Sequence, residues 1–304
     1  MANYIICLSF IGKTQSYLED CVYQIRLFTN VPIYYIYDDY GNDIVNKLYN
    51  KYNNIFLIKY EEVICKEFNI LVNENIGKFH IVDNIGDRKE LFIRSFERFY
   101  LLYNLCIKYH LENVLFLELD NLIYDDPINW FNNINEKKLC YMIDHHIDKK
   151  CASGIFFMKN ILLLKVLIDY FTYFILNNNG FMSEMIALYE FYEKYSDSVY
   201  ILQTHDSILP YSLNYKNTLN IYDAAAIGVY LFGYDKCYTN GTVVKNLKNI
   251  FSYIDYTSNK FVWIEDYYGR KIPYILKDCG GMIRINNLHI HSKTLNEALS
   301  KMST

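Results

Sequence analysis

The chain has 304 residues, of which 52% are hydrophobic and 21% charged, and its 30 Lys and Arg against 34 Asp and Glu give a formal net charge of −4. This composition excludes a disordered or low-complexity chain. No stretch is rich in Lys or Arg, so the basic surface that nucleic-acid binding requires is missing and we expect no nucleic-acid partner.

The first residues and the longest apolar stretch bear on location. The N-terminal sequence MANYIICLSFIG has no basic segment ahead of its apolar run, which favours a first strand over a signal peptide. Residues 154–176 contain Lys159, Lys165 and Asp169, and these charges favour a buried helix over a membrane span. The eight cysteines form no Cys-x-x-Cys pair, a pattern typical of reduced cysteines. We therefore expect a soluble, cytoplasmic protein without a membrane span.

Strands and helices alternate at the start of the chain. Short β-rich runs and segments with apolar residues at helical spacing predict strands at 4–9, 33–37 and 55–58, with helices at 15–28 and 44–52 between them. This order predicts a parallel sheet with right-handed crossovers. Residues 63–89 are more polar and predict loops and short helices.

The middle of the chain contains the strongest strand pattern. A long helix is expected over 91–109, followed by the apolar strand 114–119. Beyond it the patterns predict a short helix at 128–133, strands at 139–143 and 154–158, helices at 160–176 and 183–195, and a hairpin of 261–265 with 271–276. The rest of the C-terminal part is expected to be loop-rich, and no repeat or linker marks a domain boundary.

Two acidic residues stand at the end of the apolar strand. Side chains alternate across a strand, so we expect Glu118 and Asp120 on one face and Leu119 on the other. In an α/β sheet the C-terminal ends of the strands form the ligand crevice. Two hard oxygen ligands there suit Mg²⁺ or Mn²⁺, which in turn can hold a diphosphate. The alternative is a strand whose acidic end merely caps the next turn.

A second polar group lies almost at the end of the chain, where His289, His291, Ser292 and Lys293 follow one another closely. The two histidines share a face by the same alternation, and a neutral imidazole is a good third ligand for Mn²⁺. Lys293 would supply a positive charge for phosphate and Ser292 a hydroxyl. The alternative is a set of solvated residues on a frayed tail.

The order of these motifs resembles the nucleotide-sugar glycosyltransferases with the GT-A fold. Glu118-x-Asp120 is similar to their Asp-x-Asp motif, and a later strand begins at Ser153-Gly154. His289 or His291 is similar to their C-terminal metal-binding histidine, and Lys293 to their phosphate-binding lysine. Glu118 stands where the family has Asp, which leaves open whether it contacts the ribose and sugar or the metal through water.

The resemblance implies a fold as well as an activity. The fold would be an α/β fold with a mixed, mainly parallel sheet flanked by helices and a loop-rich C-terminal elaboration. Residues 1–304 would form one domain, with a nucleotide-binding half, 1–125, and an acceptor-side half, 126–304. The activity would be a hexosyltransferase-type transfer from a nucleoside-diphosphate sugar, first of all a UDP-sugar, to a hydroxyl of a glycan or protein. Mn²⁺ or Mg²⁺ would be bound by Asp120 with His289 or His291.

The same resemblance implies further donor-binding positions. Ser9 and Phe10 after the first strand, with Asp38 and Asp39 after the second, would border the nucleoside; a polar strand-end turn is the alternative for the two aspartates. Arg94 and Arg98 lie one helical turn apart and either would reach the diphosphate, although a surface ion pair with Glu97 is the alternative for one of them. The remaining positions beside the donor are Leu119, Asp144, Ser153 and Gly154.

Three carboxylates are candidates for the reacting centre, namely Glu184, Asp206 and Asp223. An inverting enzyme needs such a base near the acceptor hydroxyl, whereas a retaining enzyme has no obvious need of one. Glu184 is also a favourable first-turn residue of a helix. The small residues after Asp223 allow close approach of the backbone to a ligand, or equally tight helix packing.

Two other functions compete with the transferase. Asp144-His145-His146 resembles the Asp-His-His motif of a phosphoesterase family that uses two metals, but the chain lacks a matching Asp-x-Asp after the first strand. That reading also gives the late His-x-His-Ser-Lys no role. The other alternative is a non-catalytic sugar- or nucleotide-binding module on the same fold. Glu118 and an aromatic content of 17%, which can supply sugar-stacking surfaces, motivate it.

Overall fold

The computed structural model describes a seven-stranded central sheet in the order β10-β8-β9-β6-β1-β2-β3. Its strands are β1 (Ile5–Phe10), β2 (Ile33–Tyr37), β3 (Ile55–Lys59), β6 (Val114–Leu117), β8 (Leu139–His145), β9 (Lys150–Met158) and β10 (Val199–Leu202). The residues described are 4–38, 42–79, 82–83, 86–87, 89–132, 134, 138–235 and 242–301. Asp39, expected beside the nucleoside, lies outside them.

The strand directions confirm a mixed, mainly parallel sheet. β1 is parallel to both β2 and β6, β2 is parallel to β3, and β10 is parallel to β8. β9 alone runs the other way, because a tight turn joins it to β8 as an antiparallel hairpin and it pairs antiparallel with β6. The apolar run of β6 is buried along its whole length, as expected for a strand covered on both faces.

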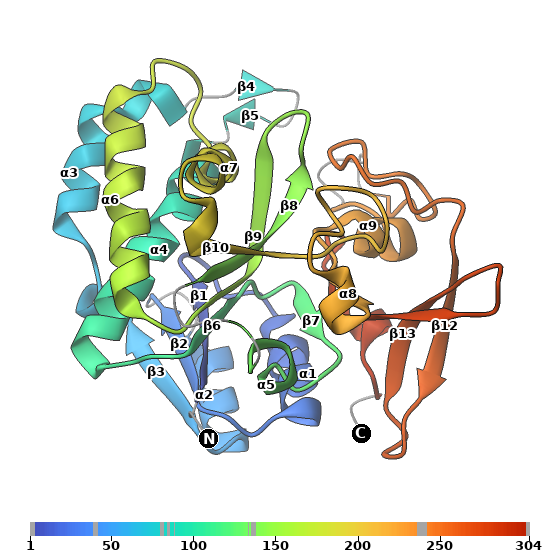
Figure 1. Cartoon of the computed structure of the whole chain (residues 1–304). Helices are drawn as coiled ribbons and strands as arrows, with labels where there is room; N and C mark the ends of the chain where they lie inside the picture. Colours follow the sequence, from blue (N-terminus) through green and yellow to red (C-terminus); the bar gives the residue numbers. More distant parts are fainter. Residues whose placement is uncertain are drawn as a thin grey trace.

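Helices cover both faces of this sheet (Figure 1). The helices are α1 (Leu18–Phe28), α2 (Asn42–Lys51), α3 (Lys66–Glu74), α4 (Lys89–Tyr109), α5 (Ile128–Phe131), α6 (Ile161–Asn177) and α7 (Glu184–Lys194), while α8 (Tyr215–Thr218) and α9 (Ala226–Phe232) lie with the C-terminal strands (Figure 1). The chain advances from β1 to β3 and then returns past β1 to β6. Right-handed crossovers in opposite directions place their helices on opposite faces. α3, α4, α6 and α7 accordingly pack together on one face (Figure 1).

The C-terminal part contains more regular structure than the sequence patterns predicted. A four-stranded sheet has the order β11-β14-β13-β12, with β11 (Asn220–Ile221), β12 (Lys260–Glu265), β13 (Lys271–Leu276) and β14 (Met282–Ile285). The predicted hairpin is its β12–β13 pair. A two-stranded ribbon joins β7 (Asn121–Ile123) to β15 (Asn287–His289), and β4 (Val82–Asp83) pairs with β5 (Gly86–Asp87). β10, β11, β14 and β15 have four residues or fewer, too short for a clear period-2 pattern.

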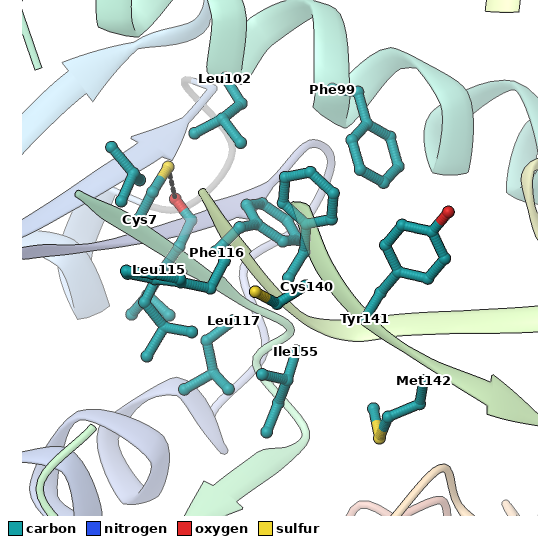
Figure 2. Packing of buried hydrophobic residues seen from close by; sticks show 14 of the residues in the cluster. Cys7, Phe99, Leu102, Leu115, Phe116, Leu117, Cys140, Tyr141, Met142 and Ile155 are labelled. Carbon is teal, nitrogen blue, oxygen red and sulfur yellow. Dashed lines mark hydrogen bonds between the residues drawn. The ribbon is translucent and has the colours of Figure 1, made fainter. Parts of the chain in front are cut away.

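The hydrophobic core joins the central sheet to the C-terminal sheet. One cluster of buried residues extends from Tyr4 to Leu299. Figure 2 shows its centre, where Phe116 of β6 and Phe99 of α4 lie near Tyr141 of β8. The ring of Phe99 meets that of Phe156 nearly edge-on, with centroids 5.1 Å apart. Within the described ranges, no helix has both the length and the apolar character needed to cross a bilayer.

Candidate active site

A cleft of about 520 Å³ opens where β1 and β6 end. Its wall combines residues that are far apart in the sequence. They include Ser9 and Phe10 after β1, Arg94 and Arg98 of α4, Glu118, Leu119 and Asp120 after β6, Glu184 of α7, and His289, His291 and Lys293 near the C-terminus. The cleft therefore lies at the C-terminal edge of parallel strands, where α/β folds bind ligands.

A turn, rather than a strand, brings the two acidic residues together. β6 ends at Leu117, and the N–H of Asn121 donates a hydrogen bond to the carbonyl oxygen of Glu118 at 3.0 Å. We expected Glu118 and Asp120 to share a face because both would belong to the strand. The strand ends before them, so that reason is wrong, but the two carboxylates do lie close together. Leu119 between them is 4% exposed.

The β7–β15 ribbon delivers the histidine to the acidic turn. His289 is paired with Asn121 in the ribbon register, and the N–H of Ile290 donates to the carbonyl oxygen of Asp120 at 2.7 Å. Glu118, Asp120 and His289 each offer one ligand atom, and these three atoms lie within 4.8 Å of one another. The late histidine is therefore anchored by backbone pairing and does not belong to a frayed tail.

One oxygen of Asp120 has two basic neighbours. Its Oδ2 lies 3.2 Å from Nε2 of His289 and also contacts Nζ of Lys293. Oε2 of Glu118 is 3.6 Å from the same imidazole nitrogen. Burial alone would raise the pKa of Asp120, but Lys293 and His289 hold that pKa well below its usual range. Burial would lower the pKa of Lys293, and the Asp120 carboxylate beside it raises that pKa instead.

Gly154 leaves the space in which this cluster packs. A Cβ at position 154 would lie 2.5 Å from Nδ2 of Asn121, 2.8 Å from Oε2 of Glu118 and 3.4 Å from Nδ1 of His289. Gly154 thus lies directly behind the acidic turn, and a side chain there would clash with Glu118 and with Asn121 of the same turn, while reaching only ordinary contact with His289.

Asp223 accepts a hydrogen bond from the backbone of His289 and so fixes its position. Its Oδ2 accepts hydrogen bonds from the N–H groups of His289 at 3.0 Å and Gly228 at 2.8 Å, and its Oδ1 accepts from Ile227 at 2.8 Å. The carboxyl is buried, and burial raises its pKa. Asp223 does not line the cleft, so the structure places it as a support of His289 and not as a carboxylate facing an acceptor.

Arg98 links the acidic turn to α7. Its guanidinium contacts the Glu118 carboxylate and donates to Ser153 Oγ at 2.6 Å and to Glu184 Oε1 at 3.0 Å. The Arg98 side chain is 12% exposed, and burial lowers its pKa. Glu184 opens α7 behind the cap residue Ser183, whose hydroxyl accepts from the N–H of Met185. The predicted Glu184 and Arg98 are therefore brought together in the cleft.

Arg94 is placed differently. Its side chain is 43% exposed and pairs with Glu97 at 2.5 Å and with Glu90 at 3.8 Å. It still lines the outer part of the cleft. The ion pair with Glu97 that the sequence suggested therefore belongs to Arg94, but the Glu97 side chain is buried, so the pair is only half exposed. Arg98, in contrast, points inward.

Several predicted residues lie away from the cleft wall. Asp38 accepts a hydrogen bond from the N–H of Gly12 at 2.7 Å, which ties the end of β2 to the loop after β1. Asp206 pairs with Lys277 at 2.6 Å and lies 3.2 Å from His205. Ser292 bonds to the hydroxyl of Thr294. Their positions in the sequence suggested a place near the site, but other groups of the protein engage these side chains, and only the partner of Ser292 is local in sequence.

The Asp-His-His residues form no metal group in the described part of the chain, where the acid–histidine grouping is Glu118, Asp120 and His289. Asp144 borders a separate small cavity with Thr204 and Ser252, and burial raises its pKa to about 7. Nδ1 of His145 accepts from the N–H of Asp148, and Nδ1 of His146 faces the Tyr189 hydroxyl at 2.6 Å.

Three contributors to the site were missed from the sequence. Tyr17 and Asp235 line the cleft, and burial, with Asp120 nearby, raises the pKa of Tyr17 to about 12. Asn287 donates to Oδ1 of Asn121 at 2.8 Å and to the carbonyl of Asp223 at 3.0 Å, bracing the two strands of the ribbon. The sequence could have identified Asn287, because it lies two residues before His289 and therefore on the same face of the strand.

The donor set fits a divalent cation. Two carboxylates and an imidazole converge with spacing that one ion can bridge, and oxygen and nitrogen ligands together suit Mn²⁺. His291 is the weaker candidate: its ring centroid is 5.3 Å from that of His289, and burial, with His289 and Lys293 nearby, lowers its pKa to about 3. It lines the cleft without joining the three-ligand group.

No family model and no curated protein matches the chain. Among solved structures, the chain is similar to apo mouse xyloside xylosyltransferase 1, with a TM-score of 0.48 and 9% identity over 72% of this chain and 94% of that one. It is similar to the galactosyltransferase LgtC in complex with donor and acceptor sugar analogues, with a TM-score of 0.37 and 14% identity over 64% of this chain and 66% of that one. It is also similar to the glycosyltransferase GlyE of Streptococcus pneumoniae, with a TM-score of 0.43 and 14% identity over 70% of this chain and 47% of that one. At such identities the similarity concerns the arrangement of elements alone.

Proposed function

We propose that this protein is a metal-dependent glycosyltransferase that transfers a sugar from a nucleoside-diphosphate sugar to a hydroxyl group of a glycan or protein acceptor. The donor we expect first is a UDP-hexose, and the cation Mn²⁺ or Mg²⁺. The observation that carries the proposal is the meeting of Asp120, His289 and Lys293 in a cleft at the end of β6. A cation site beside a lysine is the arrangement that binds a metal–diphosphate group.

The metal would be held by Asp120 and His289, with Glu118 as a third or water-mediated ligand. When bound, a divalent cation supplies positive charge opposite the departing diphosphate. Lys293 would turn from Asp120 to a phosphate oxygen, because its ammonium and the cation compete for the same carboxylate oxygen. Ser9 and Phe10 would border the nucleoside at the end of β1.

The sugar would lie toward α7. Glu184 lines the cleft and is held by Arg98, so its carboxylate is fixed in direction and suited to accept hydrogen bonds from sugar hydroxyls. Arg98 would act as a positioning residue, since its guanidinium is engaged by Glu118, Ser153 and Glu184 together.

The phosphoesterase alternative has less support. Asp144 borders the small separate cavity, and the ring nitrogens of His145 and His146 face protein groups. The binding-module alternative predicts ligand binding without turnover and is separated from the transferase by activity.

The test is release of UDP or sugar from a panel of nucleotide sugars, with Mn²⁺ or with EDTA. We expect metal-dependent turnover that Asp120→Asn abolishes. Asp169→Asn is the matched control, because Asp169 is 62% exposed on α6 and pairs across one helical turn with Lys165, away from the cleft. Binding of a nucleotide sugar without turnover in the wild type would favour the binding module, and EDTA-insensitive turnover would contradict the proposed metal site.

A further inference from the structure

A second hollow lies at the β3 edge of the central sheet. It has a volume of about 1240 Å³, against about 520 Å³ for the cleft, and the two share no lining residue. Its walls are β3, the end of α2 with the turn that follows, Tyr34 of β2 and Tyr109 at the end of α4. Because β1 and β2 separate β3 from β6, this hollow is distinct from the site at Glu118 and Asp120.

A row of aromatic rings lines one side of the hollow. Tyr34 and Phe56 are partners in the register of β2 and β3, and their rings stack with centroids 4.8 Å apart at 17°. Tyr109 continues the row at 5.8 Å from Tyr34. Phe56 is 46% exposed, and Tyr49 of α2 is 57% exposed. Such exposed ring faces offer flat apolar area with few rotatable bonds to order on binding.

Uncharged hydrogen-bonding groups line the rest of the hollow. The turn after α2 contributes Asn53 and Asn54, and the last turn of α2 contributes Asn50, all of them exposed. The Tyr52 hydroxyl is buried, and no hydrogen-bond partner for it occurs in the described ranges. Amides and hydroxyls of this kind both donate and accept hydrogen bonds.

Charge narrows the choice of ligand. No Asp, Glu, Lys or Arg is among the described residues that line this hollow. The charged side chains that adjoin it are engaged with protein groups: Lys108 pairs with Glu62, Arg26 donates to the Asn53 and Asn54 carbonyls, and Lys51 lies over the Tyr52 ring. The lining itself therefore favours an uncharged ligand. A pyranose has apolar C–H faces that pack on aromatic rings and hydroxyls that bond to amides. We propose that this hollow is a binding site for a neutral oligosaccharide. The binding site does not depend on the transfer reaction, and its volume would admit several sugar units.

The test is calorimetric titration of the full chain with neutral hexasaccharides of glucose, galactose, mannose, xylose and N-acetylglucosamine, without nucleotide or metal. We expect at least one of them to bind. Because each ring lost removes one stacking face, Phe56→Ala and Tyr49→Ala should each weaken that binding by about three- to tenfold. Both side chains are substantially exposed, so we expect both variants to fold, which circular dichroism will check.

The controls separate this site from the cleft and from nonspecific aromatic contact. Tyr267→Ala removes a tyrosine that is 96% exposed at the β12–β13 turn, and Asp120→Asn alters the cleft; neither should change hexasaccharide binding. Absence of binding to the whole panel, or binding that Phe56→Ala and Tyr49→Ala leave unchanged, would overturn the proposal. A wild-type dimer that Phe56→Ala dissociates in sedimentation would also overturn it, because a second copy would then cover β3.

Discussion

Lys293 contacts the oxygen of Asp120 that also faces His289: Nε2 of the imidazole lies 3.2 Å from Oδ2, and the ammonium of Lys293 meets the same atom. The lysine and a cation bound between Asp120 and His289 would therefore repel each other. A diphosphate that accepts the lysine would relieve this repulsion, so metal and nucleotide should bind more tightly together than separately.

This relationship predicts opposite effects of Lys293→Met on two affinities. Removing the ammonium should strengthen binding of Mn²⁺ alone by about tenfold. The reason is that a neighbouring ammonium typically shifts the pKa of a carboxylate by about one unit, and one unit is a tenfold change in an equilibrium constant. The same change should weaken binding of UDP in the presence of Mn²⁺, because a phosphate contact is lost. Calorimetric titration measures both, and weaker binding of Mn²⁺ alone would contradict the competition.

The two arginines of α4 should differ in their effect on stability. Arg98→Met would leave Glu118 and Glu184 without their buried partner, and breaking such a pair costs about 3–5 kcal/mol of unfolding free energy. Arg94→Met removes a 43% exposed side chain from the buried Glu97 carboxylate, which keeps the Tyr60 hydroxyl as a hydrogen-bond donor. We expect this smaller change to cost about 1–3 kcal/mol. Urea unfolding of the two variants compares them directly, and equal losses would contradict the buried bridge.

Gly154→Ala should disturb the metal site more than the fold. The added Cβ would press on Nδ2 of Asn121 and Oε2 of Glu118, and displaced supporting groups typically cost about 10–100-fold in metal affinity. Gly77→Ala is the matched control, because a Cβ there has nothing within 4 Å. The measurement is Mn²⁺ affinity. An unchanged affinity in Gly154→Ala would contradict this expectation, because it would mean that the acidic turn shifts without disturbing the ligands.

Asp144 should make stability depend on pH in a definite direction. Its folded-state pKa of about 7 is above the unfolded value, because the carboxyl is buried. The folded chain therefore holds a proton that the unfolded chain releases. The associated stability is present below about pH 4 and is lost as the pH rises to about 7, at roughly 1.4 kcal/mol per pH unit.

Asp144→Asn should remove this slope. The unfolding free energy of the variant, minus that of the wild type, should grow between about pH 4 and pH 7 and then stay constant. Denaturant titrations at four pH values provide the test. A difference that does not change with pH would mean that Asp144 ionises normally in the folded chain.

Local patterns predicted most of the fold. The first three strands and their helices were predicted within a few residues, because buried strands and amphipathic helices leave a signal in consecutive residues. The hairpin of β12 with β13 was visible for the same reason. β15 has three residues and pairs with β7 across most of the chain length. A pattern read over a short window contains no information about such a pairing.

The site was predictable in its residue types but not in its pairings. Glu118, Asp120 and His289 were found from their chemistry, and the structure brings them together. The ion pair of Arg98 with Glu184 depends on how α4 and α7 pack, which no spacing reveals. Asp206 and Asp223 were plausible as carboxylates, but a neighbouring lysine and three backbone N–H groups engage them.

The most direct test of the proposed function is thermal unfolding of the wild type and of Asp120→Asn with UDP, in the presence and absence of Mn²⁺. A ligand that binds the native state at a hundred times its Kd stabilises it by about 2.7 kcal/mol. We predict that UDP raises the unfolding temperature of the wild type only with Mn²⁺, and that Asp120→Asn loses this shift. A shift of equal size in both proteins, or no shift with UDP or any other nucleoside diphosphate, would contradict a metal–diphosphate site at Asp120.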